Sequence, residues 1–379
     1  MTSLPSTTRG LPRFDDLRDI IRQFTPNWFA ATMGTGILAL ALPQVPTIGP
    51  ALAPFGEALW LFDIALFGLF AGLYGARWIL FTNEARRVFG HESMSMFLGT
   101  IPMGLATIIN GFVAFGLPRF GDGVLPVAYA LWWIDVAMAL ACGVLIPYFM
   151  FTRHAHALDR MTAIWLLPVV AAEVAGASAG LLAPHLATAA DQITVLVTGY
   201  VLWAYSVPVA FAILTILMLR LALHRLPHAS MAASCWLALG PIGTGALGLL
   251  VLGGDAPAMF SAHGLAQLGA VAASLGLIGG LMIWGYGLWW LALAALLTVR
   301  YWREGIPFNL GWWGYTFPLG VYTVASFKLG TALHLAFFGW VGAMLTIALF
   351  AMWLLVASKT LAGARTGRLF HSPCIASAA

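Results

Sequence analysis

The chain has 379 residues, of which 61% are hydrophobic and only 8% are charged, against about 25% charged in an ordinary soluble domain. A soluble fold of this length could not bury so much apolar surface, because its surface-to-volume ratio leaves too much of it in water. The composition excludes a soluble enzyme or binding module and predicts an all-α integral membrane protein. The net charge of +4 does not indicate nucleic-acid binding, since excess Lys and Arg in a membrane chain usually reflect loop orientation.

The apolar residues fall into ten stretches, each long enough to cross about 30 Å of hydrocarbon at about 1.5 Å per residue. Residues 1–25 precede them, carry charges of both signs and lack the apolar core of a secretory signal, so we expect a cytoplasmic N-terminal tail. We predict a ten-helix domain over 26–358 and a cytoplasmic C-terminal tail over 359–379. The predicted spans lie near 27–43, 58–80, 94–116, 124–150, 162–183, 193–219, 232–252, 265–298, 310–327 and 332–357.

The basic residues test this count independently, because Lys and Arg accumulate in cytoplasmic loops. With the N-terminus inside, all of the 18 Lys and Arg residues except Arg119 and Lys328 fall on the inner side. A missed or invented helix would scramble this bias further along the chain, and the bias persists to the end. We therefore expect a multi-pass protein of the plasma or inner membrane with both termini in the cytoplasm.

The odd-numbered spans share a glycine or proline break near their middle, and the breaks recur every 66 to 77 residues. Proline removes a backbone hydrogen bond, and freed carbonyls at membrane depth are tolerated only against protein or a wet cavity. Five helical hairpins of one orientation can surround an axis along the membrane normal, which predicts a central pore. The alternative is a set of ordinary packing kinks. The break residues are Gly34, Gly36, Pro102, Pro168, Pro241 and Pro318.

Two patterns typical of enzymes occur inside apolar spans and lack the context that they need. The G-x-S-x-G pattern at 176–180 requires a strand before a strained turn, and the G-x-G-x-x-G pattern at 243–248 requires a βαβ unit. Cys142, Cys235 and Cys374 are too far apart for a disulfide framework or a metal spacing. We expect no enzymatic activity, no cofactor and no metal site.

Ionisable residues at membrane depth are costly and are candidates for function. Glu173 follows Pro168 by five residues and is a candidate polar group of the pore, whereas Asp63 and Asp135 lie in even-numbered spans and can bond a neighbouring helix. Lys328 ends the ninth span, where it either attracts anions at the outer mouth or extends its amine to the interface. No arginine lies in mid-span, which favours a small monovalent anion over a dicarboxylate held by bidentate arginine.

Five segments resemble the tellurite-resistance/dicarboxylate transporter family, which includes the slow-type anion channels of plants. The third to fifth spans are most similar to its fungal sulfite efflux branch. The resemblance covers nearly the whole membrane region. The segments are "FTPNWFAATMGTGI" at 24–37, "FLGTIPMGLATIIN" at 97–110, "ALWWIDVAMA" at 130–139, "MTAIWLLPVV" at 161–170 and "WWGYTFPLGVYTVASFK" at 312–328.

The resemblance implies a homotrimer in which each protomer has its own pore, lined by five inner helices with the even-numbered helices outside. It also implies a pore-blocking phenylalanine in the ninth helix, which corresponds to Phe317, and Lys328 corresponds to a lysine of the plant channels. From the residues alone, an aromatic side chain beside a kink fits packing as well as a gate.

Together these features predict efflux or facilitated diffusion of a small inorganic anion. The foremost candidate is sulfite, which would enter the pore as bisulfite. A transporter of C4-dicarboxylates such as malate, with proton coupling through Glu173, is the alternative, followed by a tellurite-resistance-type protein or a nitrate or chloride channel. A scaffold or receptor that transports nothing is a further class. The expected partners are the anion, membrane lipid and two further copies of the chain.

Overall fold

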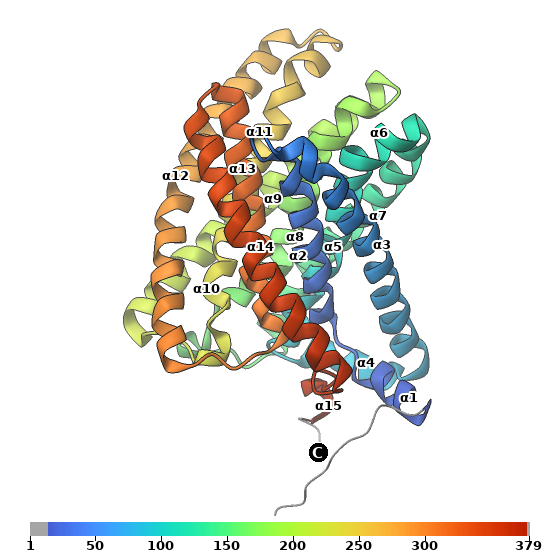
Figure 1. Ribbon diagram of the computed structural model, residues 1–379, viewed down its shortest axis with the longest axis vertical. Helices are drawn as coiled ribbons and strands as arrows, with labels where there is room; N and C mark the ends of the chain where they lie inside the picture. Colours follow the sequence, from blue (N-terminus) through green and yellow to red (C-terminus); the bar gives the residue numbers. More distant parts are fainter. Residues whose placement is uncertain (1–13, 377–379) are drawn as a thin grey trace, which may run out of the picture.

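The computed structural model describes residues 14–376, which contain helices and no strand (Figure 1). Residues 1–13 and 377–379 of the predicted tails lie outside the described residues. The first helix, α1 (Phe14–Gln23), and the last, α15 (Pro373–Ala376), lie at the same end of the molecule. We call this end the terminal face and the opposite end the distal face.

Ten helices form two concentric layers, which confirms the all-helical architecture. The inner helices are the more buried: in the most apolar part of two of them 94% of residues are buried, against 22% to 33% in the outer helices. Each inner helix contacts the next, and the last contacts the first, so the inner layer is a closed ring. The inner helices are α2 (Ala30–Ala41), α5 (Thr100–Gly111), α8 (Leu167–Leu182), α11 (Leu239–Ser261) and α13 (Phe317–Leu333). The outer helices are α3 (Gly49–Leu80), α7 (Leu125–Thr152), α9 (Ala189–His224), α12 (Ala266–Glu304) and α14 (Ala336–Arg365).

Seven stretches of the described chain are long and apolar enough to cross a membrane. One of them, Met94–Thr152, contains both α5 and α7. By contrast, α2 with 12 residues and α13 with 17 fall short of the roughly 20 residues that a spanning helix needs. The protein is therefore a multi-pass helical membrane protein, and the count of ten spans stays a prediction.

Four inner helices follow directly on a tighter 3₁₀ segment at the terminal face, whereas α11 follows the short helix α10 (Ser234–Leu237), which a 3₁₀ segment precedes. The prolines then occupy the first α-helical turn: Pro168 and Pro318 are second in their helices, and Pro102 and Pro241 are third. The predicted breaks thus lie at helix starts rather than mid-helix, because the first N–H groups of a helix have no intrahelical partner and a missing one removes no bond. The segments are η1 (Pro26–Phe29), η4 (Met94–Gly99), η8 (Ala163–Leu166), η10 (Ala229–Met231) and η11 (Leu310–Tyr315), with short helices at α4 (Thr82–Ala85), α6 (Leu117–Phe120) and α10 (Ser234–Leu237).

One tryptophan on every outer helix ties that helix to an inner helix, and we call these five residues the tryptophan girdle. Each indole N–H donates to an oxygen of the next inner helix, and the fifth, on α14, reaches back to α2 and closes the ring. The bonds run from Trp60 to Ile108 O (3.1 Å), from Trp132 to Ala175 O (3.0 Å), from Trp203 to Gly245 O (2.9 Å), from Trp284 to Ser326 Oγ (2.8 Å) and from Trp353 to Thr35 Oγ1 (3.0 Å).

The girdle predicts unequal effects of two neighbouring substitutions. Trp132 is fully buried and bonded, whereas Trp133 is 38% exposed. We expect Trp132→Phe to lower the stability of the purified protein by about 1–3 kcal/mol, because it leaves the Ala175 carbonyl without this donor. Trp133→Phe should change it by less than about 0.5 kcal/mol. Thermal unfolding in detergent measures both, and equal effects of the two variants would contradict a role for the indole bond.

Candidate functional site

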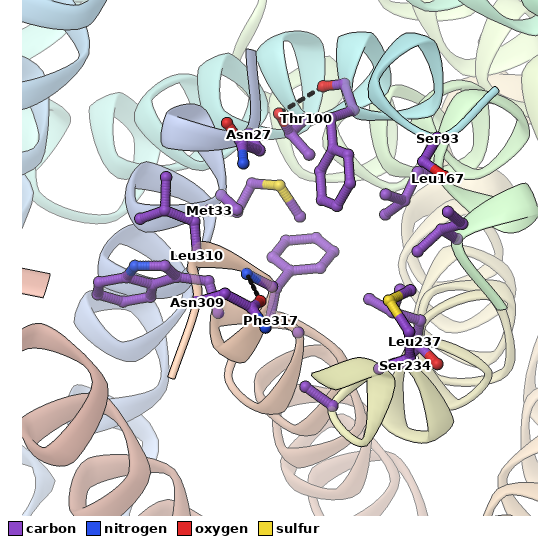
Figure 2. Close-up of a pocket in the computed structure, with 18 of the residues that line it drawn as sticks. Asn27, Met33, Ser93, Thr100, Leu167, Ser234, Leu237, Asn309, Leu310 and Phe317 are labelled. Carbon is purple, nitrogen blue, oxygen red and sulfur yellow. Dashed lines mark hydrogen bonds between the residues drawn. The ribbon is translucent and has the colours of Figure 1, made fainter. Parts of the chain in front are cut away.

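A cavity of about 190 Å³ lies inside the ring near the terminal face, and all five hairpins line it (Figure 2). We call it the proximal cavity. Its lining is mostly apolar with a minority of amides and hydroxyls, and none of its lining residues is charged. The apolar part includes Met33, Phe97, Leu167, Leu237, Trp313 and Phe317, and the polar part is Asn27, Ser93, Thr100, Ser230, Ser234 and Asn309.

Phe317 is the first residue of α13 and one of the lining residues of the proximal cavity. Its ring points into the cavity, and only 3% of the residue is exposed (Figure 2). The 3₁₀ segment η11 before it and Pro318 after it fix the backbone from which the ring projects. This position fits the predicted gate, which stays a prediction.

A larger cavity of about 680 Å³ lies inside the same ring near the distal face, and we call it the distal cavity. Lys328 lines it together with His185 and Asp255, and the amides of Gln44 and Asn110 add neutral polar groups. Lys328 lies within α13, five residues before its end, and not at the helix terminus as the sequence suggested. Among the described residues it takes part in no ion pair, so its charge is directed at the cavity.

No residue lines both cavities, and closely packed side chains separate them. A Cβ atom on Gly320 would lie 2.5 Å from Ile37 Cγ2, and one on Gly243 would lie 3.0 Å from Val321 Cγ2. We call these four residues the central constriction. At this level α13 therefore packs against α2 and α11 without spare volume.

Thr244 is a residue at this level that the sequence interpretation missed. It lies seven residues after Leu237 of the proximal cavity and three before Leu247 of the distal cavity, which is the spacing of one helix face. The hydroxyls of Thr32 and Thr323 donate to carbonyls of preceding residues, whereas Thr244 Oγ1 is buried without a partner. Thr244 thus leaves an unpaired hydroxyl at the level between the two cavities.

The buried carboxylates lie between helices and not in the cavities. Glu173 is fully buried, lines neither cavity and lies beside Ser206 of α9. Asp63 on α3 accepts a hydrogen bond of 3.3 Å from Thr107 Oγ1 on α5, and both Asp135 oxygens lack a partner. The sequence interpretation of Asp63 as a partner of a neighbouring helix fits this geometry. A pore role for Glu173 stays a prediction.

Gly34 and Gly36 bring α2 close to its neighbours without breaking it. A Cβ atom on Gly34 would lie 2.2 Å from Thr316 Oγ1, and one on Gly36 would lie 2.1 Å from Thr107 Oγ1. Their contribution is thus close helix approach, whereas the four prolines lie in the first turns of their α-helices. The two glycines hold α2 against α13 and α5, which border both cavities.

A closed ring of short helices, two cavities on its axis and a constriction between them define a membrane channel or transporter with a central pathway. Over residues 23–361 the chain matches the family described as voltage-dependent anion channel (SLAC1). The match covers most of the chain, so the protein belongs to this family, and the resemblance seen in the sequence is confirmed. Members of the family carry small anions, which is therefore the class of substrate.

Relatives extend over the whole membrane region. The chain is 37% identical to a sulfite efflux pump of Arthroderma benhamiae over 355 residues, which covers 93% of each chain. It is 29% identical to an uncharacterized transporter of Methanocaldococcus jannaschii, with 93% of this chain and 96% of the relative covered. A malic acid transport protein of Schizosaccharomyces pombe is more distant, at 24% identity with 89% and 77% covered.

The packing of α2 predicts a large effect of a single methyl group. We expect Gly36→Ala to destabilise the protein by about 1–3 kcal/mol, because the new Cβ atom overlaps Thr107 and the Asp63 carboxylate. Gly72→Ala on α3 is the matched control, since no atom lies within 4 Å of its Cβ position. That change should be neutral or stabilise by about 0.5–1 kcal/mol. Thermal unfolding in detergent tests both variants. If Gly36→Ala leaves the stability unchanged, the protein accommodates the added methyl group and the contact does not determine stability.

Proposed function

We propose that this protein exports sulfite, in its monovalent form hydrogen sulfite, along the pathway through the proximal cavity, the central constriction and the distal cavity. The observation that carries the proposal is the uncharged proximal cavity on the same axis as a distal cavity with an unpaired lysine. The sulfite efflux pump of Arthroderma benhamiae, similar over 93% of this chain, supports the choice of anion.

The electrostatics of the proximal cavity favour a single negative charge. All five inner helices begin at the terminal face, so the positive ends of their dipoles point toward this cavity. No cationic side chain lines it, and a dianion would lose most of its hydration without gaining a paired charge. Helix dipoles, amides and hydroxyls are enough to stabilise a monovalent oxyanion in the cavity, because its charge is smaller than that of a dianion.

A C4-dicarboxylate transporter is the second candidate. The distal cavity is large, and Lys328 supplies one full positive charge there. The malic acid transport protein of Schizosaccharomyces pombe is a more distant relative. Proton coupling through Glu173 belongs to this candidate, although the carboxyl lies outside both cavities. Tellurite resistance and nitrate or chloride conduction are lesser alternatives.

We further propose that the terminal face is cytoplasmic, that the membrane is the plasma or inner membrane, and that the protein transports without catalysing a reaction. The basic residues support this orientation, since Arg119 and Lys328 are the two that fall toward the distal face. The resemblance supports a homotrimer in lipid with one pathway in each protomer. Residues 26–358 form the transport unit, with short cytoplasmic tails on either side.

Phe317 provides the first test of this function. We expect Phe317→Ala to raise sulfite flux into proteoliposomes about tenfold, because removal of the ring lowers the barrier by about 1.4 kcal/mol. Phe337→Ala is the matched control, since Phe337 lies on α14 and is 60% exposed on the outer surface. Flux of sulfite, nitrate and malate should be measured for each variant. Malate transport without sulfite transport would overturn the proposed substrate, and absence of flux in every variant would favour a scaffold.

Lys328 provides a second test. We expect Lys328→Gln to weaken the apparent affinity for sulfite added at the distal face about three- to tenfold, since the positive charge that offsets Asp255 is lost from the cavity. Arg119→Gln removes a positive charge from the same face, where Arg119 already pairs with Glu57 at 2.7 Å, and should have little effect. Flux measured against sulfite concentration gives the apparent affinity of each variant. Equal effects of the two variants would indicate that sulfite responds to the total charge of the distal face and not to Lys328 itself.

A further inference from the structure

Thr244 lies on the face of α11 that borders the pathway. Leu237, seven residues earlier, lines the proximal cavity (Figure 2), and Val251, seven residues later, lines the distal cavity. Ala238 joins α10 to α11 with helical backbone angles, so the register continues from one helix into the next. Seven residues make almost two full turns, and the three side chains therefore project in nearly the same direction.

The residues on either side of Thr244 face other helices. A Cβ atom on Gly243 would lie 2.8 Å from Tyr322 N of α13. A Cβ atom on Gly245 would lie 3.5 Å from Val207 Cγ2 of the outer helix α9. Because successive residues of a helix point about 100° apart, Thr244 lies on a side of α11 that neither α13 nor α9 covers.

The hydroxyl of Thr244 differs from other buried hydroxyls of the inner helices. A serine or threonine hydroxyl inside a helix commonly donates to the carbonyl three or four residues earlier. Thr244 Oγ1 is buried, yet it makes no hydrogen bond with any described residue. The usual bond is present from Thr32 to Phe29 O (2.7 Å), from Thr107 to Gly104 O (2.8 Å), from Ser178 to Val174 O (3.1 Å) and from Thr323 to Leu319 O (2.7 Å).

This unpaired hydroxyl requires a physical explanation. A buried polar group without a partner lowers the stability of a fold, and such groups are few in native proteins. Only 1% of Thr244 is exposed, so bulk water does not reach the hydroxyl in this conformation. A ligand that enters the pathway would supply the missing partner.

We propose that Thr244 is an anion-binding residue of the pathway, and that its hydroxyl donates a hydrogen bond to the anion at the level between the two cavities. The proposal rests on the proposed function, because it names a residue that recognises the same substrate. The side chains of the central constriction are hydrocarbon or absent, and the N–H groups of α11 beside Thr244 are bonded within the helix. An anion that loses water there needs another donor, and the Thr244 hydroxyl is placed to supply it.

A single hydroxyl also determines which anions bind. It donates to a charged oxygen more strongly than to a neutral one, but it carries no charge that would hold the ion in place. Conduction requires binding that is favourable enough for entry and weak enough for release. The ligand class is therefore a monovalent oxyanion. Hydrogen sulfite should gain more than nitrate, which is the conjugate base of a stronger acid and accepts hydrogen bonds more weakly.

Removal of the hydroxyl tests the proposal. We expect Thr244→Val to lower sulfite flux in proteoliposomes about tenfold, because valine has nearly the same shape and cannot donate a hydrogen bond to the anion. Thr323→Val is the matched control, since Thr323 is equally buried on α13 and its hydroxyl is already bonded to Leu319 O. This control should change the flux less than about twofold.

The choice between anions separates recognition from packing. In Thr244→Val the nitrate flux should fall less than the sulfite flux, so the ratio of sulfite to nitrate flux should fall several-fold. Thr244→Ser retains the donor and should keep both fluxes and their ratio. All fluxes are measured at one mildly acidic pH. An unchanged ratio in Thr244→Val would contradict recognition by the hydroxyl.

Thermal unfolding in detergent supplies a readout that does not depend on transport. Thr244→Val removes an unpaired polar group, so its unfolding temperature should equal or exceed that of the original chain. A clear fall would indicate a structural role for the hydroxyl and would overturn the proposal, as would a sulfite flux equal to that of the original chain. Nitrate flux that depends on Thr244, in a chain that carries no sulfite, would instead contradict only the proposed substrate. Absence of flux for every anion would overturn both proposals.

Discussion

The structure depends on one constraint, which is that every backbone polar group at membrane depth must find a partner within the protein. Four of the five inner helices carry proline in their first α-helical turn, where the missing N–H removes no intrahelical bond, so the helices still meet this constraint. The outer helices meet it for their indole N–H groups through the tryptophan girdle, in which three of the five indoles donate to inner-helix carbonyls such as Ala175 O. The pathway is therefore shaped by the outer layer as much as by the residues that line it.

The same constraint explains where charge and polarity lie along the pathway. At the terminal face, the N-terminal ends of five helices supply partial positive charge, and neutral amides and hydroxyls line the cavity. At the distal face the dipoles have the opposite sign, and there Lys328 supplies a full positive charge that offsets both the dipoles and Asp255. The central constriction, which is apolar apart from the Thr244 hydroxyl at its level, lies between the two cavities.

Much of this architecture could be predicted from the sequence, because the apolar composition and the distribution of basic residues are averaged over whole spans and do not depend on the exact ends of the helices. The two-layer arrangement and the position of Phe317 on the cavity follow from the repeat of Gly and Pro and from the family resemblance. The local geometry could not be predicted. Proline at the start of α8 and proline at its middle give the same sequence pattern, and the depth of Lys328 depends on where α13 ends.

The remaining features needed side-chain geometry, although the sequence held weak signals for two of them. Trp60 and Trp132 each stand three residues before an aspartate, a repeat that marks corresponding points on α3 and α7. The Gly-Thr-Gly pattern occurs in both α2 and α11, yet Thr35 accepts the Trp353 indole while Thr244 is left unpaired. Identical local sequence therefore gives different chemistry, because the outer-helix indole meets the Thr35 hydroxyl on α2 but the Gly245 carbonyl on α11. No pattern in a single chain distinguishes the two threonines.

The proposed substrate matches the charge of the proximal cavity. Sulfite gains a proton and becomes monovalent in acid, and a cavity with no charged lining residue accepts that form more readily than the dianion. A cavity lined by arginine would attract the dianion as well, because arginine keeps its positive charge throughout the physiological range. The absence of charged residues from the lining therefore favours a monovalent anion over a divalent one.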